Sequence, residues 1–260
     1  YPTAPTPVTA IFAGLLTKVG MAIVIRTQTL FGSTDDGPST LLLVVAGLTM
    51  VVGVLGAIAQ NDIKRILSFH IVSQIGYMIM GLGFFTVGGV AAAIVFIIHQ
   101  IIVKASLFLV GGLVEETEGT GAIDAVDGVA RRSPILAILF LPAALSLAGF
   151  PPFSGFVGKL ALVEAGFGAQ SWAIVGVSLF ASVLTLFSMT KIWGGVFWGT
   201  PKNDTPVHVP RGMAYATASL VVVGIIIALG AEPLIGYAVR AATDLMADGV
   251  YRGLVLGAGG

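Results

Sequence analysis

Long apolar segments recur along this 260-residue chain, separated by short stretches of polar and turn-forming residues. A helix needs about 20 apolar residues to cross about 30 Å of hydrocarbon, and about seven segments reach or exceed that length. By residue number they are 8–30, 40–60, 66–87, 90–114, 134–167, 171–198 and 212–239. Their continuous apolar character favours helices over barrel strands, which alternate polar and apolar residues over about ten positions. The pattern therefore predicts an all-α, polytopic membrane protein.

The fifth segment, 134–167, is interrupted near its middle. The residues of the interruption are Gly149, Pro151, Pro152, Gly155 and Gly158. Prolines remove backbone donors and disfavour helical geometry at the residue before them. The apolar pieces on either side, about 15 and about 13 residues, are each too short to span a membrane. We therefore predict one broken helix rather than two separate short helices, with the break buried or facing a water-filled cavity.

Composition narrows the class of protein. Hydrophobic residues make up 56% of the chain, and only 10% of residues are charged, against about 25% in ordinary soluble domains. The 13 Lys and Arg residues balance 13 Asp and Glu residues, which leaves no basic excess for nucleic acid. The chain has no cysteine, and His70, His99 and His208 are too scattered for a metal site. With no phosphate-binding loop or nucleophile–base pair, we expect neither an enzyme nor a cofactor.

The charged residues between the segments predict the orientation of the chain. With seven spans, one side carries Lys64, Arg65, Arg131, Arg132, Lys202 and Arg211, and the other carries Arg26, Arg240 and Arg252. Because cytoplasmic loops hold the excess of Lys and Arg, the first side is predicted to be cytoplasmic and the C-terminus outside. Residues 115–132 are then a polar cytoplasmic loop. Residues 240–260 are mildly amphipathic and are expected to lie along the interface.

Ionisable residues inside the predicted spans are the candidate chemistry. Lys18, His99, Lys104 and Lys159 lie there, although a charge at the bilayer centre costs at least about 2.5–3.5 kcal/mol. A free lysine titrates near about 10.4, and burial can bring a lysine into the neutral range where histidine already titrates. These residues therefore predict a proton path. The alternatives are lysines that extend to an interface and a histidine that forms an ordinary helix–helix hydrogen bond.

Other polar residues are secondary candidates. Gln100 lies four residues before Lys104 and shares its helix face. Glu164 is expected either to pair with a lysine on another helix or to sit at an interface. His70 is expected near the headgroups, and Lys191 is expected to reach a Trp-rich boundary. Ser154, inside the break, completes the set.

Several stretches resemble a known family. They are 4–10 (APTPVTA), 61–68 (NDIKRILS), 73–77 (SQIGY), 104–108 (KASLF) and 149–159 (GFPPFSGFVGK). All are similar to the antiporter-like membrane subunits that complex I shares with Mrp-type sodium/proton antiporters. Within that family, residues 15–20 (LLTKVG) and 68–74 (SFHIVSQ) are most similar to the D subunits of Mrp antiporters.

The resemblance implies a fold of about fourteen helices with two inverted repeats of about five, of which this chain is the C-terminal half. Tyr1 in place of Met agrees with a piece of a longer protein. The family pattern implies that Lys18 is a lysine of the central axis and that His99 and Lys104 belong to the central polar line. It also implies that Lys159 is the lysine of the second broken helix. The first-half glutamate and its partner lysine are absent, and many relatives carry histidine where Gln100 stands.

The function that follows as an expectation is a proton-translocating subunit of a sodium/proton antiporter in the bacterial plasma membrane. Its partners would be other membrane subunits, lipid, protons and sodium ions. One alternative is a proton-pumping membrane subunit of NADH:quinone oxidoreductase. Another is a membrane scaffold that conducts no ions.

Overall fold

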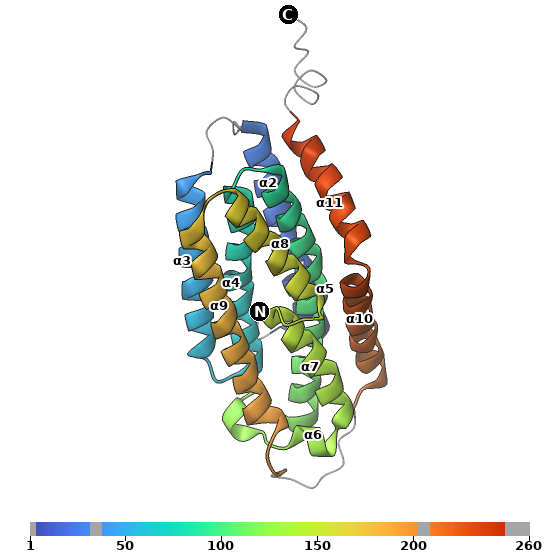
Figure 1. The fold of residues 1–260 in the computed structure, drawn as a ribbon. Coiled ribbons are helices and arrows are strands. Elements are labelled where there is room, and N and C mark those ends of the chain that lie inside the picture. The colour runs from blue at the N-terminus through green and yellow to red at the C-terminus, as the bar shows by residue number, and fades with distance from the viewer. Residues whose placement is uncertain (1–3, 32–37, 202–208, 248–260) are drawn as a thin grey trace, which may run out of the picture.

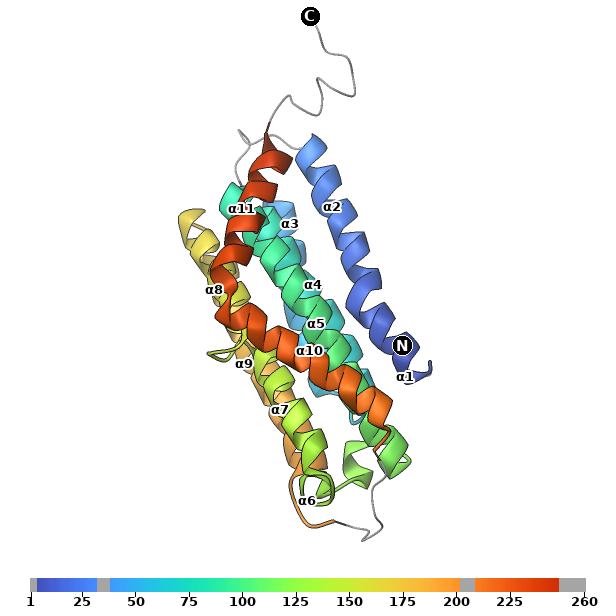
Figure 2. The ribbon, with the colours of Figure 1, turned by 90° about the vertical axis from the view of Figure 1, so that its right-hand side faces the viewer.

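The computed structural model describes residues 4–31, 38–201 and 209–247, and within these ranges every long element is a helix (Figures 1 and 2). Helices α1 (Thr6–Ile11) and α2 (Thr17–Phe31) are joined by a π-helical turn, Phe12–Leu16. The others are α3 (Thr40–Ile58), α4 (Ile63–Gly83), α5 (Val87–Glu118), α6 (Val129–Arg132), α7 (Pro134–Ala148), α8 (Ser154–Gly168), α9 (Trp172–Ile192), α10 (Arg211–Leu229) and α11 (Ala231–Met246). The predicted all-α class is confirmed.

Six helical stretches of the described residues are long and apolar enough to cross a membrane. They are Thr6–Leu30, Thr40–Ile58, Ile63–Gly83, Val87–Glu118, Trp172–Phe197 and Arg211–Leu229. Helices α7 and α8, of 15 residues each, are stacked end to end and together run the height of the bundle (Figure 1). The predicted broken fifth span is thus confirmed.

Helices α4 and α5 form the centre of the bundle. Helix α5 contacts α1, α4, α7, α8, α10 and α11, and α4 packs along α3. Glycines permit the close approach of α3 and α4: a Cβ atom on Gly53 would lie 2.4 Å from the Ser73 nitrogen, and one on Gly76 would lie 2.7 Å from the Ala46 carbonyl oxygen. Small residues at such contacts are how apolar helices associate without a hydrophobic driving force.

Side-chain caps define where the central helices begin. Ser39, Asp62 and Thr86 each accept a hydrogen bond from a backbone nitrogen in the first turn of α3, α4 and α5. We call the end of the bundle where α4 begins the basal end, and the end where α5 begins the apical end. They are the bottom and top of Figure 1.

The connection predicted at 115–132 is more ordered than expected. Helix α5 continues through Glu118, because glutamate favours helix, and stops at Gly119, whose φ is +74°. The rest contains a 3₁₀ turn (Ile123–Ala125) and α6. The Ile63 nitrogen donates to the Gly121 carbonyl oxygen (3.0 Å), which fastens this connection to the start of α4.

The C-terminal region differs from the expected boundary at 239/240. Helix α10 ends at Gly230, and α11 runs through that boundary to Met246. Ala238 and Ala242, four residues apart, face the bundle and are buried, whereas Tyr237 is exposed. This helix therefore packs on the bundle as a unit, while residues 248–260 of the expected interfacial tail lie outside the described residues.

Candidate functional site

The broken span places Lys159 against the end of α7. Helix α7 ends at Gly149, whose φ of +88° is the left-handed conformation that favours glycine. A Cβ atom on Gly155 would lie 1.7 Å from the Ser146 carbonyl oxygen, and one on Gly149 would lie 2.6 Å from Lys159 Cδ. Glycine at both positions therefore lets the two half-helices meet. Lys159 Nζ then donates to the Ala148 carbonyl oxygen at 2.9 Å.

The surroundings of Lys159 favour a cation without neutralising it. Its side chain is buried, and Nζ lies 4.9 Å from the centre of the Tyr77 ring on α4. An aromatic face attracts an ammonium group electrostatically. The Tyr77 hydroxyl donates to the Ser178 carbonyl oxygen of α9 at 2.6 Å, which fixes the ring in place. The lysine thus rests on a carbonyl oxygen and a π face, both of them neutral.

His99, on α5, faces the same break. Its Nδ1 lies 2.9 Å from Ser154 Oγ, which in turn lies 3.2 Å from Ser146 Oγ. The Gly155 nitrogen donates to Ser146 Oγ at 3.3 Å. His99 is fully buried, and its Nε2 has no hydrogen-bond partner among the described residues. The structure therefore brings together the predicted residues His99 and Ser154.

Lys104 lies further along α5 and is completely buried. Its Nζ donates to the Leu67 carbonyl oxygen of α4 at 3.4 Å. Gln100, one turn away as predicted, donates from Nε2 to Gln74 Oε1 at 3.1 Å. Gln74 Nε2 and Gln100 Oε1 lack partners among the described residues. Buried polar atoms of this kind in folded proteins usually bind internal water, so this stretch of the α4–α5 interface has unused hydrogen-bonding capacity for water.

Lys18 is held by the π-helical turn between α1 and α2. Its Nζ donates to the Ala13 carbonyl oxygen at 2.6 Å, five residues earlier. A π-helical turn changes the i→i+4 pattern of backbone bonds and recurs at functional sites. Lys18 is buried, and the nearby Thr17 Oγ1 has no partner within the described residues. The turn thus supplies a carbonyl oxygen to a lysine inside the bundle.

The four residues of the predicted path form one electrostatic group. The charges of Lys18 and Lys159 act on Lys104, and all three lysines act on His99. None of the three lysines pairs with a carboxylate within the described ranges. Nor do these ranges contain a cluster of three or more His, Cys, Asp or Glu residues that could hold a metal ion. The three lysines and the histidine are thus buried without a carboxylate partner among the described residues.

His70 differs from the sequence expectation. Instead of facing headgroups at a helix end, its ring is completely buried between α4 and α9, where Nε2 bonds Ser188 Oγ. The signal that could have located it is the spacing 67, 70, 74 and 77, which places His70 on the α4 face of Gln74 and Tyr77.

Glu164 lies outside this group. Its side chain is exposed on α8 and, in the part of the chain described, forms no ion pair with a lysine. It lines a groove of about 190 Å³ between α8, α5 and α11. Two settings were expected for Glu164, an ion pair with a lysine and a position at an interface. The ion pair is not seen among the described residues. His208 lies outside the described residues.

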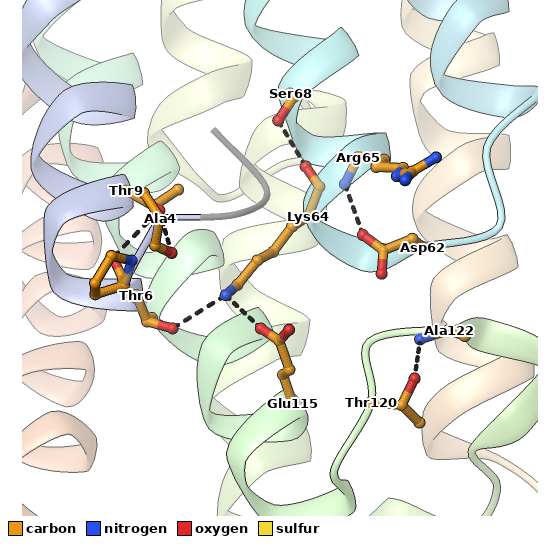
Figure 3. Close-up of polar contacts among 11 residues, drawn as sticks. Ala4, Thr6, Thr9, Asp62, Lys64, Arg65, Ser68, Glu115, Thr120 and Ala122 are labelled. Atoms are coloured by element: carbon orange, nitrogen blue, oxygen red, sulfur yellow. Dashed lines mark hydrogen bonds and ion pairs between the residues drawn. The ribbon is translucent and has the colours of Figure 1, made fainter.

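A separate polar cluster closes the basal end (Figure 3). The Lys64 ammonium forms an ion pair with Glu115 of α5 and donates to Thr6 Oγ1 of α1 at 3.2 Å. Asp62 caps α4 through the Arg65 nitrogen at 3.0 Å, and the Arg65 side chain points away from the pair (Figure 3). Lys64, expected in a loop, is therefore buried and joins three helices. Glu115, expected to be solvated, is 42% exposed.

Lys191 also joins helices at the basal end, next to the Lys64 cluster. Its ammonium donates to the Ile58 and Gln60 carbonyl oxygens (2.9 and 2.7 Å) and to Asn61 Oδ1 (2.8 Å). A cation at a helix C-terminus satisfies unpaired carbonyl groups and complements the helix dipole. Lys191 of α9 thus caps the end of α3.

Apolar spans, a broken helix and ionisable groups buried beside the break define a helical membrane protein with the features of an ion-transport subunit. The chain belongs to the family of NADH:quinone oxidoreductase and Mrp antiporter transmembrane subunits, whose model matches residues 1–185.

Individual relatives support this family assignment. The chain is 44% identical, over 95% of its length, to the D subunit of the Na(+)/H(+) antiporter of Alkalihalophilus pseudofirmus. It is 32% identical, over 98% of its length, to the D subunit of the Na(+)/H(+) antiporter of Bacillus subtilis. These matches cover 51% and 52% of the relatives, so the chain spans about half their length. The structure of the Mrp complex from a Dietzia species contains a similar chain, with a TM-score of 0.92 and 32% identity over 96% of this chain and 55% of that one. Respiratory complex I from Thermus thermophilus, at 24% identity and a TM-score of 0.68 over 80% of this chain and 44% of that one, shares the fold.

Proposed function

We propose that this chain is the C-terminal part of a D-type subunit of a multisubunit sodium/proton antiporter. Protons cross this half by hopping between Lys18, His99, Lys104 and Lys159 through intervening water. The observation that carries the proposal is that three amines and an imidazole are buried in one bundle, within reach of one another's charges and without a carboxylate partner among the described residues. In a medium where each charge is costly, such a group is retained for a function.

The hydrogen-bond partners of the lysines suit repeated proton exchange. Lys18, Lys104 and Lys159 each donate to a backbone carbonyl oxygen. A carbonyl oxygen accepts a hydrogen bond from an ammonium group and, more weakly, from a neutral amine. Each lysine can therefore lose a proton and keep its partner, so that its position does not change during the cycle.

The proposal includes partners and a location. Because the chain spans about half of its relatives, the first half of the proton path would come from the rest of the parent protein. Other membrane subunits would complete the complex, as the Mrp complex of the Dietzia species suggests. The proposed site is the bacterial plasma membrane.

The proposed orientation puts the basal end in the cytoplasm and the C-terminus outside. Among the described residues, the basic side chains of the basal connections outnumber those of the apical ones. At the basal end they are Lys64, Arg65, Arg131, Arg132 and Arg211, and at the apical end Arg26 and Arg240. Lys202 and Arg252 lie outside the described residues.

A proton-pumping subunit of NADH:quinone oxidoreductase is the second candidate, because complex I shares the fold. The genes beside the parent gene distinguish the two. Small antiporter subunits would favour the first proposal, and flavin and iron–sulfur subunits would favour the second.

A scaffold without transport is the third candidate, and it predicts that replacing Lys18 or Lys159 by methionine is harmless or stabilising.

The experiment is Lys159→Ala in the full-length parent, assembled in its complex and assayed for sodium-driven proton movement in everted membrane vesicles. We expect antiport to be lost while the complex still assembles. Lys191→Ala is the matched control, since that lysine is also on a span but caps a helix. Unchanged antiport in the Lys159→Ala complex would overturn the proposed path.

A further inference from the structure

The imidazole of His70 is a buried ionisable group at the α4–α9 interface that the path above does not use. It comes from the second turn of α4 and is completely buried. Its Nε2 bonds Ser188 Oγ of α9, and the Ser188 hydroxyl donates to the Thr185 carbonyl oxygen at 2.9 Å. The Thr185 carbonyl oxygen can only accept a hydrogen bond. Both contacts of Ser188 Oγ are therefore satisfied together when the imidazole proton is on Nε2 and the hydroxyl proton points to Thr185.

This tautomer leaves a basic nitrogen free inside the bundle. Nδ1 of His70 carries the lone pair and has no hydrogen-bond partner among the described residues. Leaving a buried polar atom unpaired is unfavourable, so such atoms usually bind internal water. A histidine that served only to tie α4 to α9 would need Nε2 alone. The free Nδ1 is the feature that a structural tie does not explain.

His70 is also adjacent to the central path. Lys104 Nζ donates to the Leu67 carbonyl oxygen, and Leu67 lies one helical turn before His70 on the same face. The charges of Lys104 and Lys159 both act on the imidazole. Gln74, the next residue on this face, also has an unpartnered nitrogen, Nε2, within the described ranges. Lys104, His70 and Gln74 thus lie along one stretch of the α4 interface, with unpartnered nitrogen atoms on His70 and Gln74 among the described residues.

Ser188, the partner of Nε2, lies on the part of α9 that runs toward the basal end. Ser188 lies one turn before Lys191, about 4.5 Å along the helix axis. The Lys191 ammonium contacts Gln60 and Asn61 in the connection between α3 and α4, where Asn61 is exposed. Beyond Ser188, a single helical turn thus separates the imidazole from polar groups at the basal end.

We propose that His70 relays protons between Lys104 and the basal end of the bundle, as a branch of the central path; this rests on the proposed function. Nδ1 accepts a proton from the Lys104 ammonium through water, which leaves Lys104 as a neutral amine and His70 as an imidazolium. Nε2 then gives its proton to Ser188 Oγ as the hydroxyl releases its own proton to water on the basal side. The remaining ring proton is now on Nδ1, and rotation of the ring by half a turn brings the protonated nitrogen back to Ser188 before the next transfer. The reverse sequence carries a proton inward.

The test is His70→Gln in the full-length parent within its complex, assayed for antiport in everted vesicles over a range of sodium concentrations. Glutamine keeps a donor for Ser188 and cannot be protonated. We expect the maximal rate to fall about tenfold or more, with the half-saturating sodium concentration unchanged, because only the proton step is affected. Ser73→Ala is the control, since Ser73 is equally buried on α4 but bonds the Met50 carbonyl oxygen of α3. A normal maximal rate for His70→Gln would overturn the proposal.

Ser188→Ala is the second variant, and it remains informative if His70→Gln fails to assemble. Removing the hydroxyl leaves the ring without its fixed tautomer, so the rate should fall by a smaller factor. In the His70→Gln background it should have no further effect, because residues that act through one group are not additive. A normal rate for Ser188→Ala, where glutamine cannot be tested, also overturns the relay. If Lys159→Ala stops antiport and His70→Gln does not, the branch alone fails; if neither stops it, the central path fails.

Discussion

Lysines occur in two settings in this bundle, and the contrast between them separates the proposed transport chemistry from structural roles. At the basal end, Lys64 pairs with the Glu115 carboxylate, and Lys191 binds carbonyl and amide oxygens at the end of α3. In the middle, Lys104 and Lys159 each contact a single carbonyl oxygen and no carboxylate in the part of the chain described.

The two settings suit different roles. The Lys64–Glu115 ion pair joins α4 to α5 and holds helices together. A lone carbonyl oxygen accepts from the charged form of a lysine and, more weakly, from the neutral form, so the central lysines keep a partner in both states. The proposed function therefore assigns structural roles to the basal lysines and a change of charge to the central ones. The predictions below test this difference in order of expected effect.

Lys104→Met should have the largest effect. The substitution removes a proton-carrying group, and such groups contribute about 100-fold or more to proton-transfer rates. We expect antiport by the full-length parent complex to fall by about that factor, while the complex assembles normally because methionine fits an apolar setting. Antiport in vesicles and complex yield on native gels measure the two effects. Antiport close to the unsubstituted rate would remove Lys104 from the path.

Gly155→Ala should act on the break rather than on a charge. The added Cβ would lie 1.7 Å from the Ser146 carbonyl oxygen, so α7 and α8 must separate. Overpacking of this kind costs about 1–3 kcal/mol. We expect lower complex yield and a lower melting temperature. Gly168→Ala is the control, since nothing lies within 4 Å of a Cβ atom there. Equal stability of the two variants would contradict the role assigned to the close approach.

Lys64→Met should affect stability more than transport. It removes the ion pair with the half-exposed Glu115 and the hydrogen bond to Thr6, which together are worth about 1 kcal/mol. We expect the melting temperature of the complex to fall by a few degrees and antiport per assembled complex to stay within about twofold. Loss of antiport as severe as for Lys104→Met would erase the distinction between the two settings.

Lys191→Met should have the smallest effect on stability. It leaves the end of α3 without its cation, at a cost of about 0.3–1 kcal/mol. The carbonyl oxygens at this end can bind water instead, because Asn61 is exposed. Thermal melting of the complex should detect a shift of a few degrees at most, and Lys191→Arg should restore it. A fall in antiport larger than in melting temperature would assign Lys191 a transport role.

The spans and the break could be predicted from the sequence because both depend on local rules. Twenty consecutive apolar residues and a Pro–Pro pair act without reference to the rest of the fold. The junction between α10 and α11 was not predictable in the same way. Gly230 is followed by further apolar residues, and whether α11 continues past 239 is decided by the packing of Ala238 and Ala242 on the bundle.

In the candidate site, too, some residues could be predicted from local sequence and others depend on how the helices pack. Lys104 and Lys159 could be found because a charge within an apolar run is conspicuous by itself. The place of His70 depends on α9 and the contact with Ser188, 118 residues away in sequence, which no local pattern indicates. Lys64 was misplaced for a similar reason, since the loop-like position of a residue beside Asn61 and Asp62 does not reveal that α1 and α5 meet there.

The most direct test of the central claim is antiport by Lys159→Arg beside Lys159→Ala in the full-length parent complex. Arginine keeps the positive charge and the donor to Ala148 but does not release its proton at physiological pH. If the middle of the bundle works by changing charge, both variants should assemble and neither should exchange sodium for protons. Substantial antiport by Lys159→Arg would show that a fixed positive charge is sufficient and would contradict the account.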